Sequence, residues 1–225
     1  MTARFNPRVL LFDMDGTLVD STAVVERTWR DFAARHGLDA ADILADSHGR
    51  RGGETVARHL PAGADVAAET ARVDEQELRD LDGVVAIPGA AELLAGLPAG
   101  SWALVTSAGP ELAARRMAAV GLPMPDVVVT GEDVRRGKPD PEGYLRAAAA
   151  LGVPATEALI FEDAEAGIEA ARAAGGRVVV VGFRTGPATS GLPRIADFTG
   201  VRADSAESGL TVELRAPADE EAARR

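Results

Sequence analysis

The sequence has 225 residues, of which 46% are hydrophobic, so it can fill one sizeable core or a core domain with a modest insert. It contains no cysteine, which excludes disulfides and thiolate metal sites and fits a reducing cytoplasm. A net charge of -11 argues against nucleic acid as the main partner, and no apolar run is long enough to span a membrane. We therefore expect a cytoplasmic protein, a monomer or weak dimer, that binds neither nucleic acid nor membranes.

The chain begins with a short lead, residues 2–7, and a buried strand. The run Val9-Leu10-Leu11-Phe12 predicts a strand over residues 8–12, and Asp13 and Asp15 follow it directly. Two carboxylates so close together repel each other, and a bound cation would remove that conflict. Gly16 lets the backbone turn at once, which leaves both carboxylates at the carboxyl end of the strand, where open α/β sheets bind ligands.

A mostly helical insert is expected after this loop. Ser21 could cap a helix that ends at His36-Gly37. Residues 38–81 show little strand pattern, with a charged amphipathic helix predicted at 70–81, and residues 84–89 return the chain to the core. The predicted division is an α/β core (1–20 and 87–215), a helical cap (21–86) and a frayed tail (216–225).

From residue 90 onward, strand and helix patterns alternate. The expected helices are residues 90–97, 111–120, 142–151 and 164–174. The expected strands are residues 101–106, 127–129, 158–161 and 177–181, with a last strand within 195–201 and an edge strand at 210–214. Such alternation predicts an α/β fold with a doubly wound parallel sheet, helices on both faces and the inserted helical cap.

Polar groups capable of chemistry follow several of these strands. They are Asp13 and Asp15, Thr106 and Ser107, Glu162 and Asp163, with Lys138 in a loop. The carboxyl ends of parallel strands converge on one edge of a sheet, so we expect these side chains to meet. The carboxylates offer hard oxygen ligands for Mg²⁺, while the hydroxyls and the ammonium suit phosphoryl oxygens. Considered separately, the hydroxyl pair could equally be a helix-entry turn, and the Glu-Asp pair could be a helix N-cap.

Lys138 is the only lysine among 24 basic residues. Lysine presents a compact point charge, whereas arginine presents a planar fork of donors. A single lysine in an arginine-using sequence indicates a position where a guanidinium would not serve, the alternative being that it is there by chance.

In order and spacing, these residues resemble the four motifs of the haloacid dehalogenase superfamily, in its phosphatase branch with a helical cap inserted after the first motif. The motifs read Asp13-Met14-Asp15-Gly16-Thr17, Val105-Thr106-Ser107, Gly137-Lys138-Pro139-Asp140-Pro141 and Phe161-Glu162-Asp163-Ala164-Glu165-Ala166-Gly167. The likeness extends from Val9 to Val181. Within that branch, Ser47-His48-Gly49-Arg50-Arg51 with Glu54-Thr55, and the run from Trp102 to Ser107, are similar to sugar- and polyol-phosphate phosphatases, including those of 2-deoxyglucose 6-phosphate and glycerol phosphate.

The resemblance implies a catalytic role for each core residue. Asp13 would attack phosphorus and form an aspartyl-phosphate. Asp15 would protonate the leaving alkoxide and then deprotonate the hydrolytic water, which requires it to carry a proton when substrate binds. Ser107, with Thr106, and Lys138 would hold the transferring phosphoryl group.

The resemblance also implies a Mg²⁺ site. Asp13 and Asp163 would be its carboxylate ligands, and Asp15 would coordinate through its carbonyl oxygen. Glu162 would either ligate the metal directly or orient a group that does.

The leaving group would be recognised by the cap, because the core motifs contact only phosphate. His48, Arg50, Arg51 and Glu54 are the candidates, the alternative being that they form a solvated loop. Closure of a cap would also exclude water during proton transfer.

Three other functions would use similar motifs. A hexose-phosphate mutase of this family carries a cap-hinge histidine, and the matching stretch here, Ala23-Val24-Val25-Glu26-Arg27, has none. A metal-free dehalogenase would not need Asp15. A phospho-receiver domain would be about half this length and would lack the insert. The sequence thus predicts a Mg²⁺-dependent hydrolase of phosphate monoesters of a small sugar or polyol.

Overall fold

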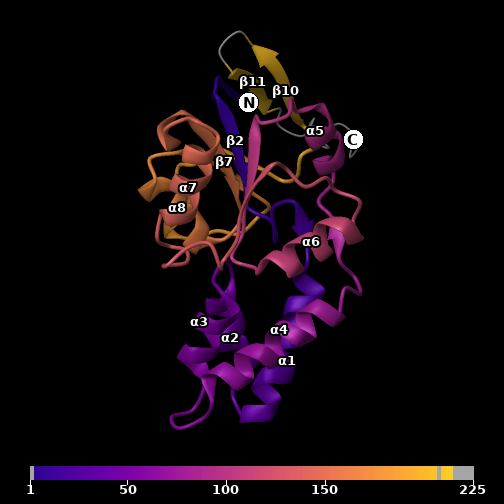
Figure 1. Cartoon of the computed structure of the whole chain (residues 1–225), viewed down its shortest axis with the longest axis vertical. Coiled ribbons are helices and arrows are strands. Elements are labelled where there is room, and N and C mark those ends of the chain that lie inside the picture. Colours follow the sequence, from indigo (N-terminus) through magenta and orange to yellow (C-terminus); the bar gives the residue numbers. More distant parts are fainter. Residues whose placement is uncertain (1–2, 207–208, 215–225) are drawn as a thin grey trace, which may run out of the picture.

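The computed structural model describes residues 3–206 and 209–214, and its centre is a six-stranded sheet (Figure 1). In spatial order the strands are β6 (Val127–Val129), β5 (Trp102–Val105), β2 (Val9–Phe12), β7 (Ala158–Glu162), β8 (Arg177–Val181) and β9 (Arg194–Ile195). Every neighbouring pair in this sheet is parallel. The predicted doubly wound α/β fold is confirmed.

Helices cover both faces of the sheet. One face packs against α5 (Ala90–Gly96) and α6 (Pro110–Ala119), and the other against α7 (Glu142–Ala150) and α8 (Glu165–Ala173) (Figure 1). Each face of the sheet carries a hydrophobic cluster, the first under α5 and α6 and the second under α7 and α8. Alternate residues of β2 divide between them: Leu10 and Phe12 belong to the first cluster, and Val9 and Leu11 to the second. Because neither face meets water, the central strands β5, β2 and β7 are apolar at every position except Glu162 at the end of β7, as the uninterrupted runs in the sequence indicated.

Strand β2 lies between β5 and β7, and this position determines where the polar groups gather. Phe12 pairs with Leu104 of β5 and with Phe161 of β7, whose ring stacks on it at a centroid distance of 5.0 Å. The segments that follow these three neighbouring strands therefore all begin at the carboxyl ends of the strands, in the middle of the sheet.

A region of four helices lies beyond this edge of the sheet (Figure 1). The helices are α1 (Thr22–His36), α2 (Ala40–Ser47), α3 (Gly52–His59) and α4 (Val66–Arg79). They surround their own hydrophobic cluster, which includes Trp29, Phe32 and Ile43. The chain enters the region through β3 (Val19–Asp20) and leaves it through β4 (Val85–Ala86), and these two short strands pair antiparallel.

Helix α4 begins four residues before the predicted start of the amphipathic helix at residue 70. Asp65 accounts for the earlier start, because its carboxylate accepts a hydrogen bond from the backbone N–H of Ala68 and so caps the helix. Within residues 3–206 and 209–214, no helix combines the length and the apolar character needed to cross a membrane.

The end of the sheet opposite the helical region carries a second, antiparallel sheet, in the order β1-β11-β10 (Figure 1). Its strands are β1 (Ala3–Phe5), β11 (Gly209–Leu214) and β10 (Val201–Ala206). Three expectations are corrected here. Residues 2–7, expected to be a plain lead, contain strand β1, and residues 210–214, expected to be an edge strand, lie in the central strand of this sheet. Residues 195–201, expected to be one strand, hold only the end of β9 and the start of β10. Residues 210, 212 and 214 are buried and the residues between them are half-buried, so β11 packs one of its faces against the first cluster. The predicted tail, 216–225, lies outside the described residues.

Candidate active site

Four buried ionisable side chains meet at the carboxyl edge of the sheet. Asp13 follows β2, Glu162 ends β7, Asp163 follows it, and Lys138 comes from the loop before α7; each is at most 8% exposed. The Lys138 ammonium donates to Asp13 Oδ1 and to Glu162 Oε1, both at 2.5 Å. One carboxylate oxygen from each of the three acids lies within 4.8 Å of the others. The structure thus brings together residues up to 150 positions apart, as the strand-end argument predicted.

Glu162 is held on both of its carboxylate oxygens. Oε1 accepts from Lys138 and from the Tyr144 hydroxyl at 3.1 Å, and Oε2 accepts from the backbone N–H of Ala164 at 2.9 Å. A Cβ on Gly167 would lie 1.6 Å from Oε1, so only glycine lets α8 approach this carboxylate so closely. These contacts orient the Lys138 ammonium, a role that differs from both of the metal-related roles expected for Glu162.

The buried charges at this edge do not balance. Burial raises the pKa of Asp13 to about 7, even though the Lys138 ammonium acts in the opposite direction. Burial, reinforced by the Glu162 and Asp13 carboxylates, raises the pKa of Asp163 well above its usual value. Burial alone would lower the pKa of Lys138, but the Asp13 and Glu162 carboxylates raise it well above the usual value, so this ammonium stays charged. In their ionised forms, the three carboxylates, the ammonium and the Arg184 guanidinium beside Asp163 carry a formal charge of -1, so a bound cation would stabilise the group.

Asp13 and Asp163 are the carboxylates best placed to hold such a cation. Within the described part of the chain, the Asp163 carboxylate has only long contacts to protein donors, 3.4 Å to the Thr17 hydroxyl and 3.8 Å to Arg184 Nε. Gly16, with φ of +87°, brings its backbone so close that a Cβ there would lie 2.3 Å from Asp163 Oδ2. Hard carboxylate oxygens that are buried, close together and short of donors fit Mg²⁺.

The two hydroxyls after β5 have different partners. Ser107 Oγ donates to the carbonyl oxygen of Gly49, in the loop between α2 and α3, at 2.8 Å. Thr106 Oγ1 accepts from the backbone N–H groups of Ala108 and Glu132, at 3.1 and 3.3 Å. Both residues line the cavity between the sheet edge and the helical region. Because Thr106 acts as an acceptor in both contacts, its own hydrogen is available to a ligand, whereas the hydroxyl of Ser107 is directed to the helical region.

The Asp15 carboxylate faces a guanidinium. Asp15 Oδ1 lies 2.9 Å from Arg116 Nη1, and the Ser21 hydroxyl donates to the same oxygen at 2.7 Å. Ser21 does precede α1, but its side chain does not cap the helix as predicted, because the hydroxyl is used for Asp15. Asp15 also lines the cavity, and its carboxylate is not part of the metal-type cluster of the described residues.

The helical region contributes two of its predicted residues to the cavity. Arg50 lines it and lies 3.5 Å from the Asp46 carboxylate. His48 lines it as well, with both ring nitrogens 3.1–3.2 Å from Arg184 Nη2. Burial, with the added effect of the Arg184 charge, lowers the pKa of His48 to about 4, so the ring is neutral at pH 7 and serves as a polar rather than a cationic contact.

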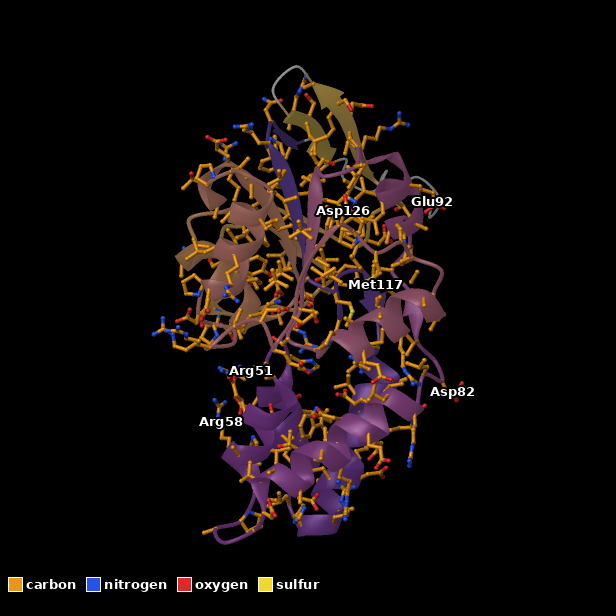
Figure 2. The ribbon with its side chains drawn as sticks, viewed as in Figure 1. Arg51, Arg58, Asp82, Glu92, Met117 and Asp126 are labelled. Carbon is orange, nitrogen blue, oxygen red and sulfur yellow. The ribbon has the colours of Figure 1, made fainter. Side chains whose placement is uncertain are left out.

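Arg51 and Glu54 do not line this cavity. The Arg51 guanidinium is 3.3–3.4 Å from the carbonyl oxygens of Gly131, Val134 and Arg135, in the core loop that leads to Lys138, and it also pairs with the Glu54 carboxylate. Figure 2 shows Arg51 where the helical region meets the sheet-containing part. The Arg51 contacts connect the two parts of the molecule and Glu54 supports Arg51, so substrate binding by these two residues stays a prediction.

Sequence reasoning missed three residues at the cavity: Arg116 of α6, Glu77 of α4 and Arg184, which follows β8. Arg116 occupies the same buried helix face as Ala113 and Met117, where a charged residue is unexpected. Glu77 stands four residues after the buried Val73, again on an inward face. Arg184 follows the carboxyl end of a parallel strand, so the rule that located Asp163 would have located it too.

Comparisons with known proteins agree with this geometry. The family model of haloacid dehalogenase-like hydrolases matches residues 7–175. Hexitol phosphatase A of Escherichia coli (strain K12) is 46% identical over 179 residues, 76% of this chain and 81% of that protein. 2-Deoxyglucose-6-phosphate phosphatase 2 of Saccharomyces cerevisiae is 35% identical over 193 residues, 76% of this chain and 78% of that protein. The crystal structure of CbbY from Rhodobacter sphaeroides in complex with phosphate has a TM-score of 0.71 and 27% identity, and the match covers 85% of this chain and 95% of that one.

The chain belongs to the haloacid dehalogenase-like hydrolase family, because the family model matches well over half of it. It is an enzyme of the phosphatase type.

Proposed function

We propose that this enzyme hydrolyses phosphate monoesters of small sugars or polyols, with Mg²⁺ as cofactor and an aspartyl-phosphate on Asp13 as intermediate. The buried network of Asp13, Lys138, Glu162 and Asp163 is the observation that carries the proposal. The hexitol and deoxyglucose phosphatases among the relatives support the substrate class.

In the first step, an Asp13 carboxylate oxygen attacks phosphorus while the bond from phosphorus to the sugar oxygen breaks. Asp15 gives its proton to that oxygen, so the product leaves as a neutral alcohol. Lys138 and Thr106 hold the phosphoryl oxygens in line with the attack. In the second step, a water attacks phosphorus and gives a proton to Asp15, and the bond from phosphorus to Asp13 breaks, which restores both carboxyl groups.

Asp13 and Asp163 would hold the cation, as the resemblance implied, with Asp15 contributing its carbonyl oxygen. When bound, Mg²⁺ would offset the repulsion between the Asp13 carboxylate and the phosphate dianion. Lys138 cannot do this unaided, because its ammonium is already shared between two carboxylates.

The helical region, residues 21–86, acts as a cap in this proposal. The cavity below it encloses about 100 Å³. Sites for small molecules usually measure roughly 300–1,000 Å³, so this cavity by itself is small for a sugar phosphate, and in the proposal the cap opens to admit it. Once closed, it places His48 and Arg50 near the part of the substrate that the core motifs do not contact.

A phosphate-release assay tests the proposal. Hexitol, deoxyhexose and glycerol phosphates are incubated with the enzyme, with Mg²⁺ and with a chelator, and Asp13→Asn is the matched variant. We expect Mg²⁺-dependent release from at least one of these substrates and a loss of about a thousandfold or more in the variant, with the fold retained by circular dichroism. Equal release by the variant would disprove the nucleophile, and conversion to an isomeric phosphate without release would indicate a mutase instead.

A further inference from the structure

Arg116 forms a bridge between the core and the cap. Its side chain is 3% exposed, with Nη1 2.9 Å from Asp15 Oδ1 and Nη2 2.9 Å from Glu77 Oε1. Asp15 belongs to the core loop after β2, whereas Glu77 belongs to α4 of the cap. One guanidinium therefore holds a carboxylate from each part of the enzyme.

This arrangement makes specific use of an arginine. The planar fork can bind two carboxylates through different nitrogens at once, which a lysine ammonium cannot do with the same fixed geometry. Burying the guanidinium is costly unless both partners are present. Burial also raises the pKa of Glu77, although the Arg116 charge acts in the opposite direction. Ala113 and Met117 already provide the apolar contacts of this face of α6, so hydrophobic packing does not explain an arginine at position 116.

The contacts at Asp15 all fall on one oxygen. Arg116 and the Ser21 hydroxyl both bind Oδ1. Among the described residues, no hydrogen bond reaches Oδ2, and Asp15 lines the cavity. Fixing one oxygen restricts the rotation of the carboxyl group and leaves the other oxygen for the substrate.

We propose that Arg116 is a positioning residue that orients Asp15 toward the leaving-group oxygen, and that it does so fully only while Glu77 of the cap holds its other nitrogen. The inference rests on the proposed function, since it assigns Asp15 the proton transfer to the alcohol. It makes the proton donor sensitive to the position of the cap: when α4 moves away, Arg116 loses one of its two carboxylates and Asp15 loses a fixed partner.

A comparison of substrates whose leaving groups differ in their need for a proton tests this role. An alkyl phosphate such as glycerol phosphate needs a proton on its departing oxygen, whereas the 4-nitrophenolate of 4-nitrophenyl phosphate departs readily without one. We use kcat/KM, which reports the steps up to loss of the alcohol and not the later hydrolysis of the aspartyl-phosphate.

The experiment compares Arg116→Met, Arg116→Lys and Glu77→Gln with wild type on both substrates. We expect Arg116→Met to lose about a hundredfold with the alkyl ester and less than about fivefold with the aryl ester, as Asp15→Asn should. Arg116→Lys should recover part of the loss, and Glu77→Gln, which keeps a neutral acceptor, should lose about tenfold with the same preference for the aryl ester. Arg115→Met is the control, because Arg115 contacts the cap through the carbonyl oxygen of Leu78 but does not contact Asp15.

A double-mutant cycle completes the test. If Arg116 acts through Asp15, adding Arg116→Met to Asp15→Asn should change kcat/KM for the alkyl ester less than about threefold. Equal losses on both esters, or losses that add to those of Asp15→Asn, would overturn the inference. If Arg116→Met does not fold, the ratio of kcat/KM for the alkyl and aryl esters is measured in Glu77→Gln and Arg116→Lys instead and tests the inference in the same way. The alkyl ester is whichever of the hexitol, deoxyhexose and glycerol phosphates the wild-type enzyme hydrolyses, and a wild-type enzyme that releases phosphate from none of them would instead contradict the proposed function itself.

Discussion

The sheet edge and the helical region contribute to the same cavity in different ways. At the sheet edge, Asp13 lines the cavity and is held by Lys138, whose ammonium lies 2.5 Å from Asp13 and 2.5 Å from Glu162. All three side chains are almost wholly buried, and Lys138 and Glu162 lie behind the cavity wall rather than in it. In the helical region, His48 and Arg50 are half-buried, and each has its own partner in Arg184 or Asp46. The helical cluster has six buried hydrophobic residues of its own and shares none with either cluster on the sheet, so the helical region packs as a separate unit.

The difference indicates a division of labour. In the proposed mechanism, the chemistry that requires fixed distances rests on strand ends that are packed on both faces, whereas recognition of a variable leaving group would rest on a cap that opens and closes.

Lys138→Arg should have the largest effect. The pocket between Asp13 and Glu162 holds a single ammonium that also lies 5.3 Å from the centre of the Tyr144 ring, and a guanidinium is too large and flat for it. We expect activity to fall about a hundredfold or more and the protein to lose roughly 1–3 kcal/mol of unfolding free energy through overpacking. Steady-state kinetics and denaturant unfolding measure both.

Arg136→Lys is the matched control for that substitution. Arg136 lies two residues away, is largely exposed and pairs with Asp140. Its kinetics should match wild type. If Lys138→Arg retained the wild-type rate, the single lysine would have no special function.

Asp163→Asn should separate catalysis from stability. Removing a buried, poorly paired carboxylate should raise the melting temperature of the metal-free protein, while turnover falls about a hundredfold or more. Wild type should gain a few degrees when Mg²⁺ is added at about a hundred times its Kd, and the variant should gain nothing. Thermal unfolding with and without Mg²⁺ checks this.

Asp126→Asn provides the control, because Asp126 is exposed and lies in the sheet-containing part (Figure 2). It should show the same Mg²⁺ response as wild type. An undiminished response in Asp163→Asn would remove that residue from the proposed metal site.

Arg51→Met addresses the junction of the two regions. Loss of the contacts to Gly131, Val134 and Arg135 should weaken closure of the cap, so we expect kcat/KM to fall about tenfold with little change in circular dichroism. Arg58→Met is the control, since Arg58 pairs with Asp46 inside the helical region (Figure 2). Identical kinetics for the two variants would show that the Arg51 contacts do not affect closure.

His48→Gln should have the smallest effect on stability, and that effect should appear in its pH dependence. Between pH 6.5 and 4, the unfolded His48 takes up a proton that the folded one refuses, so wild type loses stability as pH falls through this window. The variant lacks this group, so its unfolding free energy should fall by roughly 1–2 kcal/mol less than that of wild type on going to pH 4. The figure is below what the full pKa shift would give, because solvent screens part of the effect at a half-buried ring. Chemical denaturation at several pH values measures this, and parallel curves for the two proteins would contradict the assignment.

The sequence was informative where strands determine positions. Asp13, Thr106 and Asp163 could be predicted to meet because each follows an apolar strand, and parallel strands end at one edge. Lys138 was found through its rarity and through its motif, although its loop has no such periodicity. The small antiparallel sheet was harder, because β1 is only three residues long and its partner lies at the other end of the chain.

The sequence was least informative about the cap. Arg50 and Arg51 are adjacent, yet one lines the cavity and the other binds carbonyl groups of the core, a difference set by loop geometry that has no period. Arg116 and Glu77 lie at inward positions of regular helices, so a search for charged residues on apolar faces would have found them. The substrate, the oligomeric state and the cytoplasmic location remain predictions from the sequence.

The most direct test of the whole scheme is to trap the phosphorylated enzyme. Wild type is mixed with a substrate that it turns over in the presence of Mg²⁺, quenched in acid within a single turnover, and digested for peptide mass spectrometry. The scheme predicts a phosphoryl group on the Asp13 side chain in wild type and none in Asp13→Asn or without Mg²⁺. Continued turnover with no phosphoryl group on Asp13, or with the group on another residue, would contradict it.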